Sequence, residues 1–484
     1  MNTYIGIDVG TSGTKILLVD KNGKILSQVT EEYDVYYPKD GWSEQNPSDW
    51  IIAIKNGIDK LFVDGNKRED VKGVSFGGQM HGLVMLDEFD QVIRPAILWN
   101  DGRTQSQTDY LNQSVGKETL SSLTANVAFA GFTAPKILWV KEHEPENFNK
   151  IAKICLPKDY VAYMLTGVFS TDYSDAGGTL LLDVKNKCWS DEMCEKCSVS
   201  KSWLPKLYES YEVIGKIKSA YNLPNAIVTA GAGDNAAAAI GTGTVKNGNC
   251  NISLGTSGTV FISSDEFSVD KKNALHVFPH ASGKWHSMGC ILSAASANKW
   301  WIKDILDADY QLPDDIEEKL GENSVFFLPY LMGERSPHND VNARGTFIGM
   351  RQNTTKDEMS LSVLEGVAFA LKDCIEVARE NNIEVNKVTI CGGGAKSLLW
   401  KKIIANIFDV QVLSVETEQG PGYGAAILAM VGAGEYESVL QATDKLVKIS
   451  STVCPDKTIA EKYSKKYEIY KKLYPALKSV FAQM

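Results

Sequence analysis

An aspartate among very small residues is the first feature of this sequence that could do chemistry. Asp234 lies in the segment AGAGDNAAAA, between glycines and a run of alanines. Small neighbours let a substrate approach the carboxylate closely, as a general base that accepts a hydroxyl proton requires. Asp is also a favoured N-cap residue, and the alanines predict a helix that it could cap. The residues alone leave both interpretations open.

A glycine-rich turn that occurs twice is the second such feature. IDVGTSGT at residues 7–14 recurs as ISLGTSGT at residues 252–259, and both copies lie between β-rich runs. Each copy predicts a hairpin whose turn offers backbone N–H groups and hydroxyls to a phosphate. Neither is a Walker A loop, because the G-x-x-x-x-G-K-[ST] spacing is missing and a strand follows. One such turn alone favours a plain hairpin, whereas two predict a pair of phosphate sites, formed by Gly10, Thr11, Ser12, Lys15, Gly255 and Thr256.

Asp8 lies shortly before the first turn, inside an apolar strand. Its neighbours Ile5, Ile7 and Val9 share one face of that strand, which leaves Asp8 on the other. A carboxylate in such surroundings is costly unless it faces a cation. We therefore expect Asp8 to coordinate Mg²⁺ through water and to take part in catalysis. The alternative is an exposed strand carboxylate.

The elements that hold these residues also occur in duplicate. VKGVSFGG at residues 71–78 matches VNKVTICG at 385–392, and GDNAAAAIG at 233–241 matches GYGAAILAM at 422–430. Three matched elements in the same order predict two homologous domains, residues 1–245 and 246–484, the second ending in a charged helix. The predicted fold class is α/β with mixed sheets, because the hairpins are antiparallel and the later strand–helix units should be parallel.

Two helices show start signals in the sequence. Ser48 could cap a helix that carries an apolar face from Trp50 to Leu61. Thr355 and Glu358 have the spacing of a capping box before a long apolar helix.

Composition narrows the possible partners. Of the 484 residues, 44% are hydrophobic and 23% are charged, and the net charge is −10. An acidic chain is a poor match for nucleic acid or an anionic membrane, so we expect neither as a partner and favour a small neutral substrate. The N-terminus has no signal-peptide pattern and no stretch approaches membrane-spanning length, which predicts a cytoplasmic protein. A homodimer is left open.

The nine cysteines are odd in number and scattered, which is typical of a reducing compartment. Only Cys188, Cys194 and Cys197 cluster. Their CxxC spacing could bind zinc, but no fourth ligand is evident nearby, so a plain helical surface is favoured.

Two longer motifs give the sequence a family resemblance that covers almost the whole chain. GFTAPKILW at residues 131–139, and GTFIGM at residues 345–350 with Leu364 and Glu365 beyond it, resemble the two signatures of the FGGY carbohydrate kinases. The resemblance implies two duplicated actin-like (ribonuclease H-like) ATPase domains with a cleft between them. It also implies that these domains close around a sugar and ATP.

Within that family, further segments resemble the members that act on D-xylulose: GQMHG at 78–82, WNDGR at 99–103, PKDY at 157–160 and SDAG at 174–177. The resemblance implies that Met80 and His81 contact the sugar, and that Asp234 and Asn235 contact its reacting end. It also implies an adenosine pocket lined by Gly393, Gly394 and Ala395, with Trp300 beside the adenine.

Plainer roles remain for some of these residues. His81 could satisfy a turn carbonyl, and Trp300 or Trp301 could belong to the core. Asp101 and Arg103 could form an ion pair that shapes the sugar pocket without touching the sugar.

Taken together, the residues and the resemblance predict phosphorylation of D-xylulose to D-xylulose 5-phosphate, with MgATP as donor and Asp234 as base. Within the family, ribulose or gluconate is the alternative acceptor. A chaperone ATPase or a non-catalytic sugar sensor on the same fold is the alternative from another class.

Overall fold

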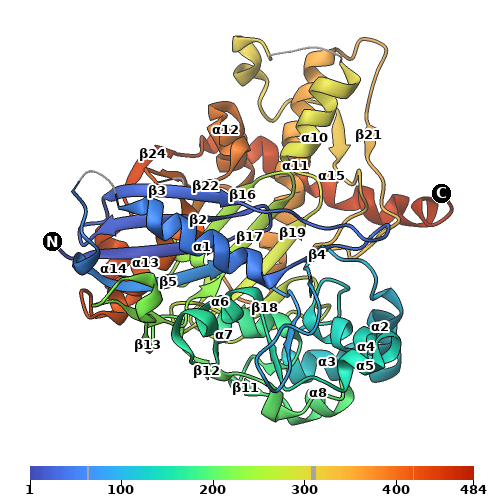
Figure 1. The fold of residues 1–484 in the computed structure, drawn as a ribbon. Coiled ribbons are helices and arrows are strands. Elements are labelled where there is room, and N and C mark those ends of the chain that lie inside the picture. The colour runs from blue at the N-terminus through green and yellow to red at the C-terminus, as the bar shows by residue number, and fades with distance from the viewer. Residues whose placement is uncertain (63–64, 307–311, 418) are drawn as a thin grey trace. The chain divides into compact units, whose positions relative to one another are not determined.

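The structure is a computed structural model that describes residues 1–62, 65–306, 312–417 and 419–484 (Figure 1). The chain forms two compact units. The first contains residues 1–245, 277–286 and 419–447, and the second contains 246–276, 287–418 and 448–484. Two segments that follow residue 245 therefore belong to the first unit. The predicted domain boundary after residue 245 stays a prediction.

The first unit is built on a mixed sheet with the strand order β13-β14-β5-β1-β2-β3. In this sheet β5 runs parallel to β1 and β14, whereas β1–β2, β2–β3 and β13–β14 are antiparallel. A short strand, β15, extends the sheet beside the end of β5. The bounds are β1 (Thr3–Val9), β2 (Gly13–Asp20), β3 (Ile25–Glu32), β5 (Val71–Gly78), β13 (Val213–Lys216), β14 (Ile227–Thr229) and β15 (Ala232–Gly233).

A second sheet repeats this plan, with the order β24-β23-β22-β16-β17-β19-β18, in which β18 is His276–Pro279. Again the hairpin β16–β17 is antiparallel, the next strand β22 is parallel to the first, and the edge strand β24 is antiparallel to its neighbour. The predicted duplication, the two hairpins and the mixed sheets are confirmed. The bounds are β16 (Asn249–Leu254), β17 (Gly258–Ser264), β19 (Trp285–Ile291), β22 (Lys387–Cys391), β23 (Val412–Val415) and β24 (Ile449–Val453).

The helices of the first unit pack against its sheet or lie between the segments that connect its strands. The helices α9 (Asp234–Gly241) and α13 (Gly420–Gly432) pack against each other and against the sheet. Their glycines allow this, because a Cβ on Gly424 would overlap the carbonyl oxygen of Ala237. The other helices are α1 (Pro47–Leu61), α2 (Gln105–Asp109), α3 (Lys117–Thr124), α4 (Thr133–His143), α5 (Pro145–Phe148), α6 (Pro157–Thr166), α7 (Tyr173–Ala176), α8 (Asp191–Lys196) and α14 (Val439–Leu446).

Short strand pairs support the same loops in the first unit. They are β4 (Glu44–Gln45) with β7 (Ala96–Ile97), β6 (Val84–Leu86) with β8 (Lys153–Cys155), β9 (Ser170–Asp172) with β12 (Lys206–Tyr208), and β10 (Leu182–Asp183) with β11 (Cys188–Trp189). In the second unit β20 (Phe326–Leu328) pairs with β21 (Thr346–Ile348), and its helices include α10 (Ala295–Lys299), α11 (Lys356–Glu380), α12 (Leu398–Phe408) and α15 (Lys457–Phe481).

One of the two predicted helix starts is confirmed and the other is wrong. Thr355 and Glu358 form the capping box of α11. The first helix begins at Pro47 with Asn46 as its N-cap, so Ser48 lies inside the helix. Proline suits the first helical position because its φ is already helical and its missing N–H costs nothing there. None of the helices in the described part of the chain is long and apolar enough to cross a membrane.

Candidate active site

Asp234 begins helix α9 at the end of strand β15, and the pairing of β15 with β5 places Gly233 level with Gly78. The N-cap of this helix is Gly233, and no side chain caps it, so the capping interpretation of Asp234 is wrong. Oδ1 of Asp234 accepts hydrogen bonds from the backbone N–H and the amide group of Asn235, at 2.7 and 2.9 Å. Oδ2 accepts none from the described residues, which leaves it available to a ligand.

Asp8 lies at the same edge of the sheet. The register pairs Asp8 of β1 with Gly77 of β5, and pairs Gly77 in turn with Ala232 of β15. Asp8 is half-buried and points away from the core that its apolar neighbours enter, as predicted. Its carboxylate makes no hydrogen bond within the described ranges, so an approaching cation or water would meet an unengaged ligand.

Both carboxyls have raised pKa values. Burial, helped by the negative charge of Asp234 and opposed by Lys15, raises the pKa of Asp8 to about 7. Burial also raises the pKa of Asp234 to about 6, against the hydrogen bonds from Asn235 that lower it. Lys15 donates a hydrogen bond from Nζ to Oε1 of Gln419 at 2.9 Å. A cation between the carboxylates and a phosphate would relieve this repulsion.

The first turn closes the predicted hairpin between β1 and β2. Gly10 N donates to the carbonyl of Gly13 at 3.1 Å, and the hydroxyl of Tyr33 donates to the carbonyl of Gly10 at 2.6 Å. Ser12 is exposed at the tip of this turn. The turn is therefore closed by the chain itself and presents its tip to solvent.

The hydroxyl of Thr11 is already engaged. It donates to Oε1 of Gln79 at 3.1 Å and accepts from the indole N–H of Trp99 at 3.0 Å. Gln45 donates to the carbonyl of Thr11 at 2.6 Å and accepts from Gln79 at 2.9 Å. Thr11 thus anchors the turn, and phosphate contacts at this residue would come from its backbone N–H.

Met80 and Asn235 lie beside Asp234. The side chain of Met80 fills the space where a Cβ on Gly233 would be, only 2.9 Å from Met80 Cγ. The amide of Asn235 approaches the Met80 sulfur at 3.9 Å. The structure therefore brings together three of the four residues expected to bind sugar.

His81, the fourth, follows Met80 directly and has a φ of 69°. Its Nδ1 lies 2.8 Å from the carbonyl of Gly178, so the plainer role expected for this residue is present. The ring stacks on Phe132 with centroids 4.6 Å apart. A non-glycine residue with positive φ is strained, and such strain is kept only where the surroundings hold it.

The first family signature holds His81 in this conformation. The hydroxyl of Thr133 and the ammonium of Lys136 donate to the carbonyl of His81 at 3.1 and 2.9 Å. Lys136 also donates to the carbonyl of Gly131 at 2.7 Å. Burial of the Lys136 ammonium lowers its pKa to about 7, while the charge of Asp101 acts in the opposite direction. Residues of this signature therefore hold the predicted sugar-binding loop through the carbonyl of His81.

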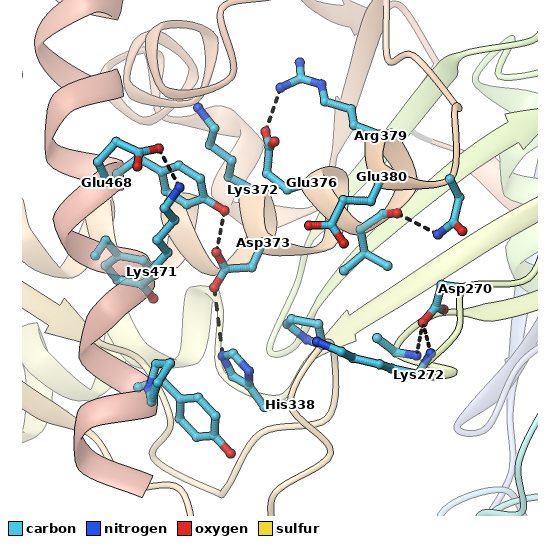
Figure 2. A pocket seen from close by; sticks show the side chains of 18 of the residues that line it. Asp270, Lys272, His338, Lys372, Asp373, Glu376, Arg379, Glu380, Glu468 and Lys471 are labelled. Atoms are coloured by element: carbon cyan, nitrogen blue, oxygen red, sulfur yellow. Dashed lines mark hydrogen bonds and ion pairs between the residues drawn. The ribbon is translucent and has the colours of Figure 1, made fainter.

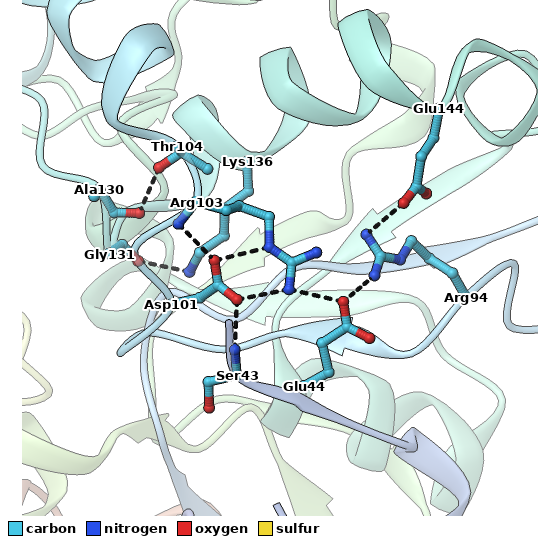
Figure 3. A network of polar contacts seen from close by, with 10 residues as sticks. All are labelled: Ser43, Glu44, Arg94, Asp101, Arg103, Thr104, Ala130, Gly131, Lys136 and Glu144. Atoms are coloured by element: carbon cyan, nitrogen blue, oxygen red, sulfur yellow. Dashed lines mark hydrogen bonds and ion pairs between the residues drawn. The ribbon is translucent and has the colours of Figure 1, made fainter. Parts of the chain in front are cut away.

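Asp101 and Arg103 form the ion pair that the sequence offered as an alternative (Figure 3). Arg103 donates to both oxygens of Asp101, at 2.8 Å from Nε and 2.6 Å from Nη2, and pairs with Glu44 at 2.7 Å. Its guanidinium lies over the ring of Trp42 at 3.6 Å and over that of Trp139 at 4.9 Å. Arg103 is buried, so this network supports the loop and does not offer a free cation.

The second turn, in the second unit, is tied to the start of α10. The backbone N–H groups of Ala294 and Ala295 donate to the carbonyls of Thr256 and Gly255 at 3.0 and 2.9 Å. The hydroxyl of Ser296 donates to the carbonyl of Thr256 at 2.6 Å. Because the carbonyls are engaged, Thr256 is held at an exposed tip, as Ser12 is in the first turn.

The glycines predicted to line the adenosine pocket follow β22, beside this second turn. A Cβ on Gly394 would lie 2.9 Å from Cβ of Leu254, whereas a Cβ on Gly393 would meet nothing within 4 Å. Ala395 packs against the core. Trp300 is half-buried and stacks at 6.3 Å on Phe327. Trp301 is the core residue of that pair, since only 5% of its surface is exposed.

The cysteine cluster shows no sign of a metal site. Cys194 and Cys197 are buried and Cys188 is exposed, and all three are free thiols. In the described ranges no three side chains among His, Cys, Asp and Glu are grouped to hold a metal ion. A magnesium ion held by a single carboxylate, phosphates and water would not need such a group.

A cavity of 920 Å³ lies in the second unit between α11 and α15 (Figure 2). None of the predicted site residues lines it. Many of its charged groups are already engaged, through Glu376 with Arg379, Glu468 with Lys471, and Asp373 with the Tyr467 hydroxyl.

Four polar residues with a part in this site were not predicted. Gln45 and Gln79 hold the first turn, and Asp172 and Ser174 lie behind Asp234. Gln79 and Ser174 fall inside motifs that resemble the family, and that was the signal available for them. Gln45 and Asp172 lie outside those motifs, and the contacts that tie them to the site, to Gln79 and Thr11 for Gln45 and to Ser210 and Lys158 for Asp172, come from distant parts of the sequence.

Comparison with known proteins finds matches over nearly the whole chain. The family models described as "FGGY family of carbohydrate kinases", N-terminal and C-terminal domain, match residues 3–241 and 250–433. A xylulose kinase from Escherichia coli (strain K12) is 40% identical, over 99% of this chain and 100% of that protein. Solved structures of a gluconate kinase and of a ligand-bound xylulose kinase, both from Lactobacillus acidophilus, are each 27% identical, with TM-scores of 0.93 and 0.92. They cover 100% of this chain, and 99% and 100% of their own lengths.

Proposed function

The chain belongs to the FGGY family of carbohydrate kinases, and we propose that the sugar it phosphorylates is D-xylulose. The identity of 40% over full length to a xylulose kinase supports this choice. Fold similarity does not decide the sugar, since the gluconate kinase and the xylulose kinase structures match almost equally well. The product would be D-xylulose 5-phosphate, and ATP the phosphoryl donor.

The unengaged Oδ2 of Asp234 carries the proposal for the chemistry. Asp234 accepts the proton of the terminal sugar hydroxyl as that oxygen attacks the γ-phosphorus of ATP. Asn235 donates two hydrogen bonds to Oδ1 of Asp234, and these bonds fix the orientation of the carboxylate and therefore the position of Oδ2. Met80 and His81 position the sugar against this carboxylate.

The phosphates would be held by the two glycine turns. Gly10, Thr11 and Ser12 present backbone N–H groups in one, and Gly255 and Thr256 present theirs in the other. Lys15 follows the first turn and adds a positive charge. Gly393, Gly394, Ala395 and Trp300 would receive the adenosine.

Asp8 is the residue that fits Mg²⁺. Its carboxylate is half-buried, has no hydrogen-bond donor in the described ranges and has a raised pKa, all of which favour a cation at this place. When bound with ATP, the ion would neutralise charge on the transferring phosphoryl group. The protein itself holds Asp8 near the end of β1, in register with Gly77 of β5 and, through it, with Ala232 of β15, two residues before Asp234.

A cytoplasmic location completes the proposal, and a homodimer is left open. The nine free cysteines support a reducing compartment. Sedimentation of the purified protein would decide whether it is a dimer.

A panel of acceptors tests the proposed sugar. The protein is incubated with MgATP and D-xylulose, ribulose or gluconate, and the product is identified by mass and by the position of its phosphate. We expect the highest kcat/KM with D-xylulose and phosphate on its terminal oxygen. A higher kcat/KM with either other acceptor would reject the sugar assignment, and ADP formation without any phosphosugar would reject the kinase reaction itself.

A further inference from the structure

The loop that leads into Asp234 is held from two sides. Gly231 has a φ of 75°, and a Cβ there would lie 2.6 Å from the carbonyl oxygen of Phe76. Its backbone N–H donates to the carbonyl of Ser210 at 3.0 Å. The N–H of Gly233, the residue directly before Asp234, donates to the hydroxyl oxygen of Ser174 at 3.1 Å. The second contact therefore joins a side chain to the N-cap residue of α9, directly before Asp234.

Both serines meet at a single carboxylate. The hydroxyls of Ser174 and Ser210 donate to Oδ2 of Asp172 at 2.5 and 2.7 Å. Because the only proton of the Ser174 hydroxyl goes to Asp172, its oxygen is left to accept from the N–H of Gly233. Asp172 thus fixes the direction of the whole chain of hydrogen bonds.

Asp172 is completely buried, so its charge must be balanced within the protein. Lys158 supplies the balance, with Nζ 2.9 Å from Oδ1 of Asp172 and 2.6 Å from Asp159. The same ammonium lies 3.8 Å from Asp175, whose two buried oxygens accept no hydrogen bond from the described residues. Burial alone would lower the pKa of Lys158, but the three carboxylates outweigh it and raise it.

The cluster of Lys158 and its carboxylates packs against the end of β5, the strand beside β15 and Asp234. A Cβ on Gly78 would lie 2.6 Å from Cβ of Lys158, and Gly78 is level with Gly233 across the β5–β15 pair. Asp172 is therefore within the packed layer that supports Asp234, although it cannot reach a substrate.

We propose, on the basis of the role proposed above for Asp234, that Asp172 is a positioning residue for this base, acting through the Ser174 hydroxyl and the Gly233 N–H. Lys158 pairs with Asp172, and the carboxylate accepts the hydroxyl proton of Ser174 and so orients it. The anchored N–H then sets where α9 starts and so where the carboxylate of Asp234 lies. Loss of the anchor lowers turnover and leaves sugar binding largely intact.

Ser174→Ala tests this with a matched control in the same cluster. Ser210→Ala removes an equally buried hydroxyl bond to Asp172, but Ser210 holds the loop through its backbone carbonyl, which the substitution keeps. Both variants should lose a similar few degrees of melting temperature, about 2–4 °C. We expect S174A to lower kcat by roughly tenfold or more with sugar KM within about threefold, and S210A to lower kcat less than about threefold.

A double variant shows whether Ser174 acts through Asp234. In an Asp234→Asn background, S174A should cause no further loss of kcat, because the group that it positions is already gone. Should S174A not fold, Ser174→Cys keeps a weak donor and acceptor in a similar volume, and its kcat must still fall below that of S210A.

Three results are decisive. Equal kcat values for the Ser174 variant and S210A would overturn the positioning role, and so would a full further loss of kcat in the D234N background. If D234N itself turns over like the wild type, the proposed base is wrong. The comparison of the Ser174 variant with S210A would then still tell whether the anchor matters for turnover, so the two failures are distinguishable.

Discussion

The acid side of the pH profile should report the surroundings of Asp234. Burial raises the pKa of this carboxyl to about 6. A base with that pKa is ionised in about nine of ten molecules at pH 7 and in about one of ten at pH 5. The value of kcat/KM for the sugar, measured at saturating MgATP, should therefore fall about tenfold between those pH values.

A carboxyl with the ordinary pKa of 3.8 would behave differently. It would stay more than about 90% ionised over the same range and leave the profile nearly flat. Product should be measured in stopped samples, and melting curves at each pH should show that the protein stays folded. A value of kcat/KM that does not change between pH 7 and pH 5 would refute the reasoning.

Asn235 offers a second perturbation of the same group. Its side chain donates to Oδ1 of Asp234, and this hydrogen bond lowers the pKa of the carboxyl. Asn235→Ala removes the side-chain bond and keeps the backbone one. The midpoint of the acid limb should then move to higher pH, and a midpoint that moves to lower pH would contradict the account.

Three further outcomes are expected. Asp8→Asn should raise the melting temperature of the metal-free protein at about pH 8 and change it little near pH 4. The reason is that ionising a carboxyl whose folded pKa is about 7 costs stability above that pH, and costs nothing below its ordinary pKa of 3.8. Calorimetry that shows the same gain at both pH values would contradict this. Gly424→Ala should destabilise the protein by more than about 2 kcal/mol, because its Cβ would overlap the backbone of α9. Gly102→Ala, where the nearest atom is 3.6 Å away, is the control, and equal urea midpoints for the two would reject the close packing. Arg103→Lys should cost about 1–3 kcal/mol, since Lys cannot keep two bonds to Asp101 and one to Glu44, and should raise sugar KM more than it lowers kcat; an unchanged urea midpoint would count against a supporting role for the network.

The repeated parts of the fold were predictable because the repeat is written in the sequence. The two GTSG turns come with the same strand pattern on both sides, and a hairpin is a local structure that such a pattern determines. The capping box at Thr355 and Glu358 is local in the same way. The error at Ser48 is also local, because Pro47 and Asn46 together give a better helix start than Ser48 does.

Long-range contacts were not predictable. The anchors of Asp234 come from Asp172 and Ser174, about sixty residues earlier in the chain, and polar bonds between distant segments leave no periodic signal. The return of α13 to the first unit is similar. The sequence matched residues 422–430 to residues 233–241 as a repeat, but nothing in it indicated that these two helices pack against each other.

The residues proposed to bind the sugar were chosen through the family motifs, and the structure adds a physical reason for part of those motifs. His81 holds an unfavourable φ because Thr133 and Lys136 bind its carbonyl. The motif GFTAPK is thus explained by its support of the loop at residues 78–82. For Asp234, the structure removes the capping alternative that the residues alone left open.

Turnover of the Asp234→Asn variant tests the central claim most directly. Initial rates with MgATP and D-xylulose are compared with the wild type, and sugar affinity is measured separately by calorimetry. The account predicts a loss of kcat of roughly a hundredfold or more, as expected for removal of a general base, with sugar affinity changed by only a few fold. A kcat close to that of the wild type would contradict it.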